Sequence, residues 1–167
     1  KEERINASKS LKGPINSFNG DRKSVLGDLK EAVYLAKIIS YAQGFSLLKA
    51  ASNEYSWNLN YGNIALMWRG GCIIRSIFLG KIKEAFDGNK KLANLLLDPF
   101  FKEKANQAQI GLRRIVSQAA LNGVSIPAIS SALTYYDGYR SEMLPANLLQ
   151  AQRDYFGAHT YERIHQP

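Results

Sequence analysis

The chain has 167 residues, enough for one domain of ordinary size whose core needs no disulfide or metal to hold it together. Its content of 46% hydrophobic and 22% charged residues excludes a disordered or fibrous protein. The net charge of +8 indicates an anionic partner, whether phosphorylated metabolite, nucleotide or nucleic acid, but basic and acidic residues are interleaved, so charge alone does not choose among them.

The first third of the chain predicts two helices, because its apolar residues recur at the helical period without sustained alternation. A helix over residues 1–11 should end at Gly13-Pro14, where proline removes an amide donor, and a loop over residues 17–21 should follow. The run from about Ser24 to Tyr55 is apolar on nearly every side, which predicts a long central helix enclosed by others. Gly44 within it indicates a close helix contact or a bend.

The middle of the chain predicts shorter, antiparallel helices. Two of them, Tyr61–Arg69 and Cys72–Phe86, should be separated at Gly70-Gly71, and a turn should then lead into a short helix that ends at Leu97. Asp98-Pro99 has the pattern of an N-cap followed by proline at the first helical position, so a long helix should start there and end at Asn122-Gly123. Its buried face should comprise Phe101, Ala105, Ala108, Leu112, Ile115 and Ala119.

The last part of the chain predicts two more helices, over about Pro127–Glu142 and Pro145–Tyr155, and a tail without apolar period from Gly157 onward. The fold class is therefore all-α, with a multi-helix domain over residues 1–155 and a C-terminal tail over residues 156–167. The apolar stretches should leave a hydrophobic face that one copy cannot cover, which predicts a dimer.

The sequence also constrains where the protein works. The least charged stretch, Ile38–Leu48, is far shorter than the roughly 18 to 20 apolar residues that a membrane helix needs, so we expect no membrane span. Lys1–Ser10 lacks the pattern of a signal peptide, and the single cysteine, Cys72, excludes an internal disulfide. We expect a cytoplasmic protein, and the absence of an initial Met suggests a piece of a longer one.

Catalytic chemistry has little support within the chain. His159, His165 and Cys72 are too few and too scattered for a zinc site, so we expect no metal, and Cys72 lies among apolar residues typical of a buried position. No Gly-x-Ser-x-Gly elbow occurs, and no Gly-x-Gly-x-x-Gly follows a strand. We therefore assign no catalytic residue to this chain, and any dinucleotide would need a binding fold elsewhere.

The segment near the C-terminus departs from a generic helical bundle. Polar and aromatic side chains crowd into a dozen residues, namely Gln150, Gln152, Arg153, Asp154, Tyr155, His159, Thr160 and Tyr161. Arginine offers a planar fork of donors that matches phosphate or carboxylate oxygens, and histidine can add another donor. The competing interpretation, which composition alone favours, is a surface ion pair between Arg153 and Asp154 beside an exposed His159.

Three blocks of sequence carry a resemblance that changes this balance. They are SYAQGF at residues 40–45, YGNIA at 61–65 with WRGGCIIR at 68–75, and LPANLLQAQRDYFGAHTY at 144–161. In this order they resemble the 6-phosphogluconate dehydrogenase family, and with the opening KEER the likeness covers essentially the whole chain.

The resemblance implies an NADP-dependent oxidoreductase that decarboxylates 6-phosphogluconate to ribulose 5-phosphate, in the pentose phosphate pathway and gluconate utilisation. It also implies a homodimer in which Arg153 and His159 reach the partner subunit's active site and help bind the phosphorylated substrate. The family's catalytic Lys and Glu and its glycine-rich NADP loop precede the matched region. We therefore expect the chain alone to be inactive.

Two alternatives remain at this point. A basic all-α module for nucleic acid is supported only by the charge and the tyrosine content, and it would need a basic stripe on one helix face. A fragment that merely dimerises would differ from the enzyme domain only in whether Arg153 and His159 touch substrate.

Overall fold

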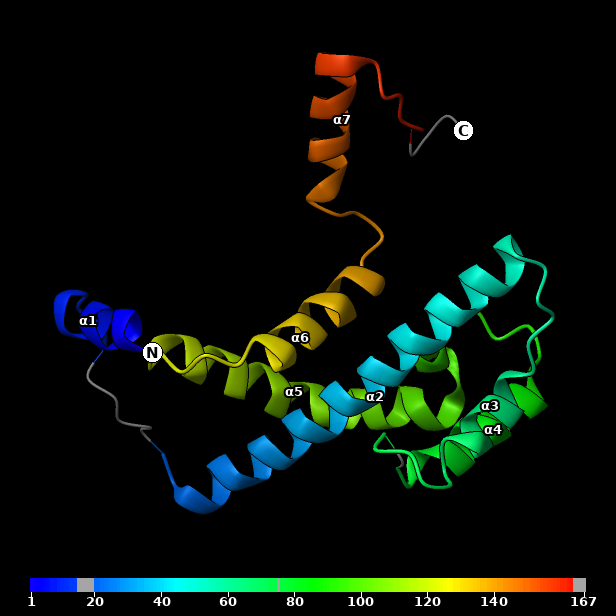
Figure 1. The fold of residues 1–167 in the computed structure, drawn as a ribbon, viewed down its shortest axis with the longest axis horizontal. Helices are drawn as coiled ribbons and strands as arrows, with labels where there is room; N and C mark the ends of the chain where they lie inside the picture. The colour runs from blue at the N-terminus through cyan, green and yellow to red at the C-terminus, as the bar shows by residue number, and fades with distance from the viewer. Residues whose placement is uncertain (15–19, 75, 164–167) are drawn as a thin grey trace. The chain divides into compact units, whose positions relative to one another are not determined.

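The computed structural model describes residues 1–14, 20–74 and 76–163, which form seven α-helices and one 3-10 helix (Figure 1). They are α1 (Glu2–Ser10), α2 (Arg22–Glu54), α3 (Tyr61–Met67), α4 (Phe78–Gly88), η1 (Leu95–Leu97), α5 (Pro99–Leu121), α6 (Pro127–Tyr139) and α7 (Ala146–Gly157). The predicted all-α class is confirmed. Of the loop predicted over residues 17–21, residues 17–19 lie outside the described residues, as does Arg75 of the second resemblance block.

The chain forms two compact units, Lys1–Leu133 and Thr134–Pro167, and each is described by itself. The prediction of one domain over residues 1–155 and a tail over residues 156–167 stays a prediction. None of the described helices is both long enough and apolar enough to cross a membrane.

The core of the first unit is the packing of α2 against α5. All six residues predicted to form the inner face of α5 are buried: Phe101, Ala105, Ala108, Leu112, Ile115 and Ala119. From α2, Leu35, Ile38 and Ile39 are completely buried. The period of three and four therefore predicted the face of α5 correctly, because only one stripe of this helix meets a neighbour.

A close approach of the two helices lies at Gly111 of α5, where a side chain would meet α2. A Cβ atom at Gly111 would lie 3.1 Å from the Cα atom of Asp28 and 2.8 Å from the Cβ atom of Glu31. At Gly44 such an atom would meet nothing within 4 Å, so the close contact, one of the two possibilities there, is not made within the described chain. Glycine at position 111 lets the two backbones approach each other.

The exposed side of α2 corrects a second expectation, that this helix is enclosed on nearly every side. Leu26, Leu29 and Val33 are 54%, 40% and 51% exposed. Together with Tyr34 and Phe78 they line a mainly apolar groove of about 480 Å³. The sequence run is apolar all round, but the chain itself supplies partners for only part of it.

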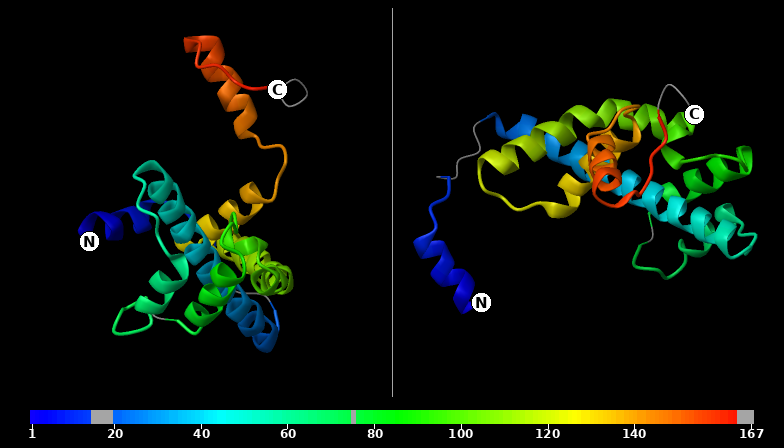
Figure 2. Two further views of the ribbon diagram at one scale, coloured as in Figure 1. Left: turned by 90° about the vertical axis from the view of Figure 1, so that its right-hand side faces the viewer. Right: turned by 90° about the horizontal axis from the view of Figure 1, so that it is seen from above.

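Helices α3 and α4 lie side by side, as both views of Figure 2 show. An aromatic cluster joins them to Phe45 of α2. The ring centroid of Phe45 lies 6.5 Å from that of Tyr61, 5.3 Å from that of Trp68 and 5.1 Å from that of Phe86. Helix α4 starts at Phe78, so the prediction that it starts at Cys72 is wrong. Gly71, with φ of +75°, lies at the predicted break between the two helices, but α4 starts only at Phe78, and Ile73 and Ile77 before it are 99% and 91% exposed.

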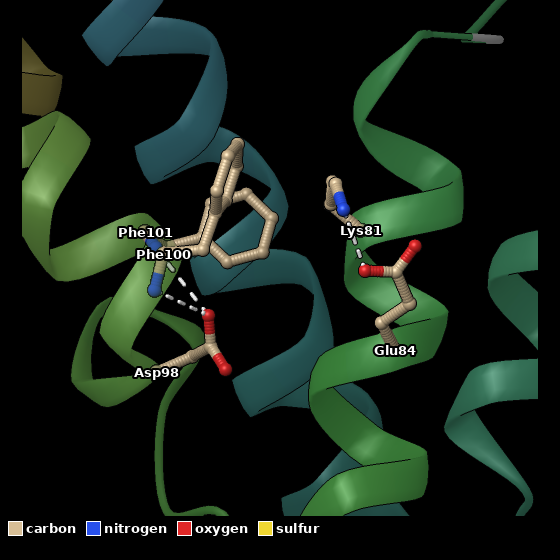
Figure 3. Close-up of polar contacts among 5 residues, drawn as sticks. All are labelled: Lys81, Glu84, Asp98, Phe100 and Phe101. Carbon is tan, nitrogen blue, oxygen red and sulfur yellow. Dashed lines mark hydrogen bonds and ion pairs between the residues drawn. The ribbon is translucent and has the colours of Figure 1, made fainter.

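The start of α5 shows how a local signal fixes a helix end (Figure 3). The Asp98 carboxylate accepts hydrogen bonds from the backbone N–H groups of Phe100, at 3.0 Å, and Phe101, at 3.3 Å. The Lys81 ammonium of α4 lies 5.6 Å from the Phe100 ring centroid and pairs with Glu84 at 2.7 Å. Asp98-Pro99 is thus the predicted N-cap, and the predicted end of α5 at Asn122-Gly123 is also confirmed.

Helix α6 ends at Tyr139, earlier than the predicted Glu142, and α7 runs to Gly157 rather than Tyr155. The rings of Tyr135 and Tyr139 stack at 6.0 Å, and burial, reinforced by Tyr135, raises the pKa of the Tyr139 hydroxyl. The connection to α7 contains Leu144-Pro145, and Pro145 provides the N-cap position rather than the first helical residue.

Candidate functional site

The second unit ends in the segment that the sequence singled out. Helix α7 has no buried residue, and its apolar Leu148, Tyr155 and Phe156 are 77%, 87% and 78% exposed. The helix ends at Ala158, whose φ of 51° and ψ of 41° are left-handed, and whose N–H donates to the Asp154 carbonyl at 2.8 Å. Thr160 is also left-handed, with φ of 61°, so the chain reverses direction just after α7 (Figure 1).

Two side chains of α7 stabilise this reversal through hydrogen bonds to the backbone of one tail residue, Thr160. The Gln150 amide donates to the Thr160 carbonyl oxygen at 2.7 Å. The Asp154 carboxylate accepts from the Thr160 N–H, also at 2.7 Å. Gln150 and Asp154 are one helical turn apart and face the same way, so both polar groups of the Thr160 backbone are satisfied.

Arg153 belongs to the same cluster. One of its guanidinium nitrogens, Nη1, lies 3.4 Å from the Gln150 amide oxygen as its donor. The Gln150 amide therefore joins Arg153 on one side to Thr160 on the other. The surface ion pair of the competing interpretation, between Arg153 and Asp154, is not found among the described residues; one oxygen of the Asp154 carboxylate accepts from the Thr160 N–H instead.

His159 lies in the reversal, between the two left-handed residues Ala158 and Thr160. A Cβ atom placed on Gly157 would lie 3.2 Å from both Cδ2 and Nε2 of the His159 ring. The ring thus packs against the backbone at Gly157, and a side chain at that position would press on it. Arg153 and His159 are both exposed, so their donors can reach a ligand.

This arrangement can bind an anion. A guanidinium binds phosphate or carboxylate oxygens through paired, charge-assisted hydrogen bonds, and an imidazole can add one more donor. The sequence pointed to Arg153 and His159, and it missed the connecting roles of Gln150 and Asp154. The spacing of four between those two residues was the available signal, but their common partner lies in the tail.

Other parts of the described chain offer less. No group of three or more His, Cys, Asp and Glu side chains in these ranges could hold a metal ion. A polar hollow of about 840 Å³ in the first unit is lined in part by Lys49, Asp87 and Lys90, and contains no residue predicted as a site. Cys72 is partly exposed rather than buried, contrary to expectation.

Comparison with known proteins assigns the chain as a whole. The family model described as 6-phosphogluconate dehydrogenase, C-terminal domain, matches residues 1–167. Similar curated proteins are named 6-phosphogluconate dehydrogenase, decarboxylating: the human protein is 62% identical over 100% of this chain, and that of Staphylococcus epidermidis is 57% identical over 98%. The chain spans 35% of the length of each of these two relatives.

A solved structure gives the same result for the fold. The 6-phosphogluconate dehydrogenase of Plasmodium falciparum is similar with a TM-score of 0.91 and 44% identity, covering 99% of this chain and 36% of that one. It is described in its apo form, with its cofactor NADP+ and with its substrate 6-phosphogluconate. None of these comparisons supports the alternative of a nucleic-acid-binding module.

Proposed function

Since this chain belongs to the 6-phosphogluconate dehydrogenase C-terminal domain family, we propose that it is the dimer-forming and substrate-completing part of such an enzyme. The enzyme oxidises and decarboxylates 6-phosphogluconate to ribulose 5-phosphate and CO2 with reduction of NADP. The observation that carries the proposal is the cluster at the end of α7. It combines the exposed Arg153 on the helix with the exposed His159 in the reversed segment that follows.

In this proposal Arg153 and His159 bind the phosphate of the substrate. A guanidinium gains most from a dianion, because each of its paired hydrogen bonds is then charge-assisted, whereas sugar hydroxyls do not require the charge. His159 lies in the tail beyond the helix end and contributes a second donor from a different direction. Neither residue takes part in the redox chemistry, whose groups lie outside this chain.

The enzyme acts as a homodimer. Two apolar surfaces of the described chain lack a cover: the groove at Leu26, Leu29 and Val33 of α2, and the side chains of Leu148 and Phe156 on α7. Exposed apolar surface of this kind marks an interface, and a second copy is the simplest partner. Sedimentation should give a dimer at micromolar concentration, and a monomer would contradict this part of the proposal.

Arg153 and His159 serve the active site of the other subunit. Both lie near the end of the chain, on or beyond a helix that has no buried residue and can therefore pack on a neighbouring copy. The test mixes two full-length subunits. One carries Arg153→Ala, and the other has an intact tail but lacks the enzyme's catalytic lysine, which lies outside this chain.

If Arg153 acts across the dimer, the mixed dimer contains one complete site and recovers activity that neither parent has. A control mixture pairs a subunit that carries both changes with an unaltered one. Its mixed dimer has no complete site if Arg153 acts across the dimer, and one complete site if Arg153 acts within its own subunit. Purification on two different affinity tags, one for each subunit, shows that mixed dimers form. Mixed dimers that form and stay inactive would place Arg153 in its own subunit and overturn the assignment.

The cofactor is proposed to bind mainly outside this chain. The described residues contain no strand followed by a glycine-rich turn, which is what a dinucleotide requires. We therefore assign no NADP contact to any residue here. Cytoplasmic location and roles in the pentose phosphate pathway and gluconate utilisation complete the proposal.

A further inference from the structure

In the second unit, hydrogen bonds connect Arg153 and His159, the two residues proposed to bind phosphate. The connecting residues are not themselves proposed to touch the phosphate. Arg153 meets the oxygen of the Gln150 amide, and the nitrogen of the same amide donates to the Thr160 carbonyl. The Asp154 carboxylate accepts the N–H of the same threonine. Thr160 directly follows His159, so the position of the histidine depends on this pair of bonds.

The backbone in this segment needs such support. Ala158 and Thr160 have φ of 51° and 61°, a region that residues other than glycine adopt at a free-energy cost. No residue of α7 is buried, so core packing does not hold the reversed conformation within the described chain. Besides the bond from the Ala158 N–H to the Asp154 carbonyl, the side-chain hydrogen bonds of Gln150 and Asp154 to Thr160 hold it.

From this geometry we infer that Gln150 and Asp154 are positioning residues for substrate binding, which hold Arg153 and His159 in one preformed phosphate cradle. Gln150 orients the guanidinium, and the two residues together hold the turn that carries the imidazole. The inference rests on the proposed function of Arg153 and His159, and it adds two residues that act only through them. A preformed cradle binds more tightly because fewer groups lose freedom when the ligand arrives.

The first test replaces Asp154 in the full-length dimer. Asp154→Ala should raise the KM for 6-phosphogluconate about 10-fold, the contribution typical of one hydrogen bond to a charged group, while kcat and the KM for NADP stay within about twofold. Asp154→Asn keeps an oxygen that can accept from the Thr160 N–H, and it should restore most of the affinity. A role in folding alone would not divide the two KM values in this way.

Gln150→Ala should have a similar effect, because it removes both the contact to Arg153 and the bond to Thr160. The matched control is Gln152→Ala, an exposed glutamine on the same helix for which no side-chain hydrogen bond is recorded among the described residues. This control should leave both KM values unchanged. Sedimentation should show that all variants remain dimers.

A double-mutant cycle separates failure of this inference from failure of the proposed function. If Asp154 acts through the cradle, adding Asp154→Ala to an enzyme that already carries Arg153→Ala and His159→Ala should raise the KM by less than about twofold. A full 10-fold rise in that background, no effect of Asp154→Ala alone, or no rescue by Asp154→Asn would overturn the inference while leaving the proposed function intact. An unchanged KM in Arg153→Ala itself would overturn the proposed function, and the inference with it.

Discussion

Helices α5 and α7 differ in what their sequences specify. On α5, apolar residues at steps of three and four are all buried, so each of them is accounted for within the described chain. On α7 no residue is buried, and Leu148, Tyr155 and Phe156 are mostly exposed. The hydrogen bonds from its polar residues instead hold the chain end that follows. The core of the described chain accounts for the apolar face of α5, whereas no described residue covers the apolar side chains of α7, for which we propose a second subunit.

The largest effect that we expect concerns the chain alone. The purified 167-residue chain should not reduce NADP in the presence of 6-phosphogluconate, because neither a nucleotide fold nor the family's catalytic lysine and glutamate can be located in it. The measurement is the absorbance of reduced nicotinamide, with the full-length enzyme as control. Detectable turnover by the pure chain would contradict this prediction, because catalytic groups would then have to lie within it.

Substituting one phenylalanine on each helix compares how much α5 and α7 contribute to the stability of the subunit. Phe101 of α5 is 0% exposed, and Phe101→Ala should lower the free energy of unfolding by about 3 to 5 kcal/mol, as is typical of an emptied core position. Phe156 of α7 is 78% exposed, and Phe156→Ala should change the stability of the subunit itself by at most about 0.5 kcal/mol. Urea unfolding followed by tryptophan fluorescence measures both changes.

Measuring both stability losses at several protein concentrations distinguishes the two phenylalanines further. If Phe156 packs on a second subunit, the loss in Phe156→Ala should grow as the wild-type dimer becomes more populated, whereas the loss in Phe101→Ala should not depend on concentration. A concentration-independent loss of several kcal/mol in Phe156→Ala would show that α7 is part of a core within one subunit.

Arg153→Ala tests whether α7 contributes to substrate binding. Removing one member of a buried, charged pair typically costs about 2 to 5 kcal/mol, which corresponds to roughly thirty-fold to several thousand-fold in affinity. The KM for 6-phosphogluconate should therefore rise by that factor, and the KM for NADP should change far less. Steady-state kinetics of the full-length enzyme measures both constants. Equal increases in the two would argue against contact with the phosphate.

A smaller effect on stability than that of Phe101→Ala concerns the local signal that starts α5. Asp98→Ala removes the acceptor for the N–H groups of Phe100 and Phe101 and should lower the free energy of unfolding by about 1 kcal/mol, with activity retained. Asp98→Asn is the matched control, since asparagine caps helices about as well as aspartate. A loss in Asp98→Asn as large as in Asp98→Ala would show that the carboxylate charge at the helix N-terminus, rather than the cap hydrogen bonds, stabilises the start of α5.

Local signals in the sequence predicted the helices well. The cap at Asp98-Pro99, the stop at Asn122-Gly123 and the inner face of α5 all follow from interactions within a few residues. The prediction failed at Cys72, where the apolar spacing continues although α4 starts only at Phe78. At Gly44 the close contact, one of two possibilities, is not made within the described chain, because a glycine in a helix does not reveal which neighbour approaches it.

The sequence by itself determined the fold class, the ends of α5 and, through the family resemblance, the two residues proposed to bind phosphate, Arg153 and His159. The structure alone decided that α2 leaves an apolar groove open, that the close crossing lies at Gly111, and that Gln150 and Asp154 both hold Thr160. The physical reason is the distance along the chain over which each interaction acts. Capping, periodicity and turn formation act between neighbours in the chain, whereas groove, crossing and cluster depend on the positions of segments that the sequence does not bring together by itself.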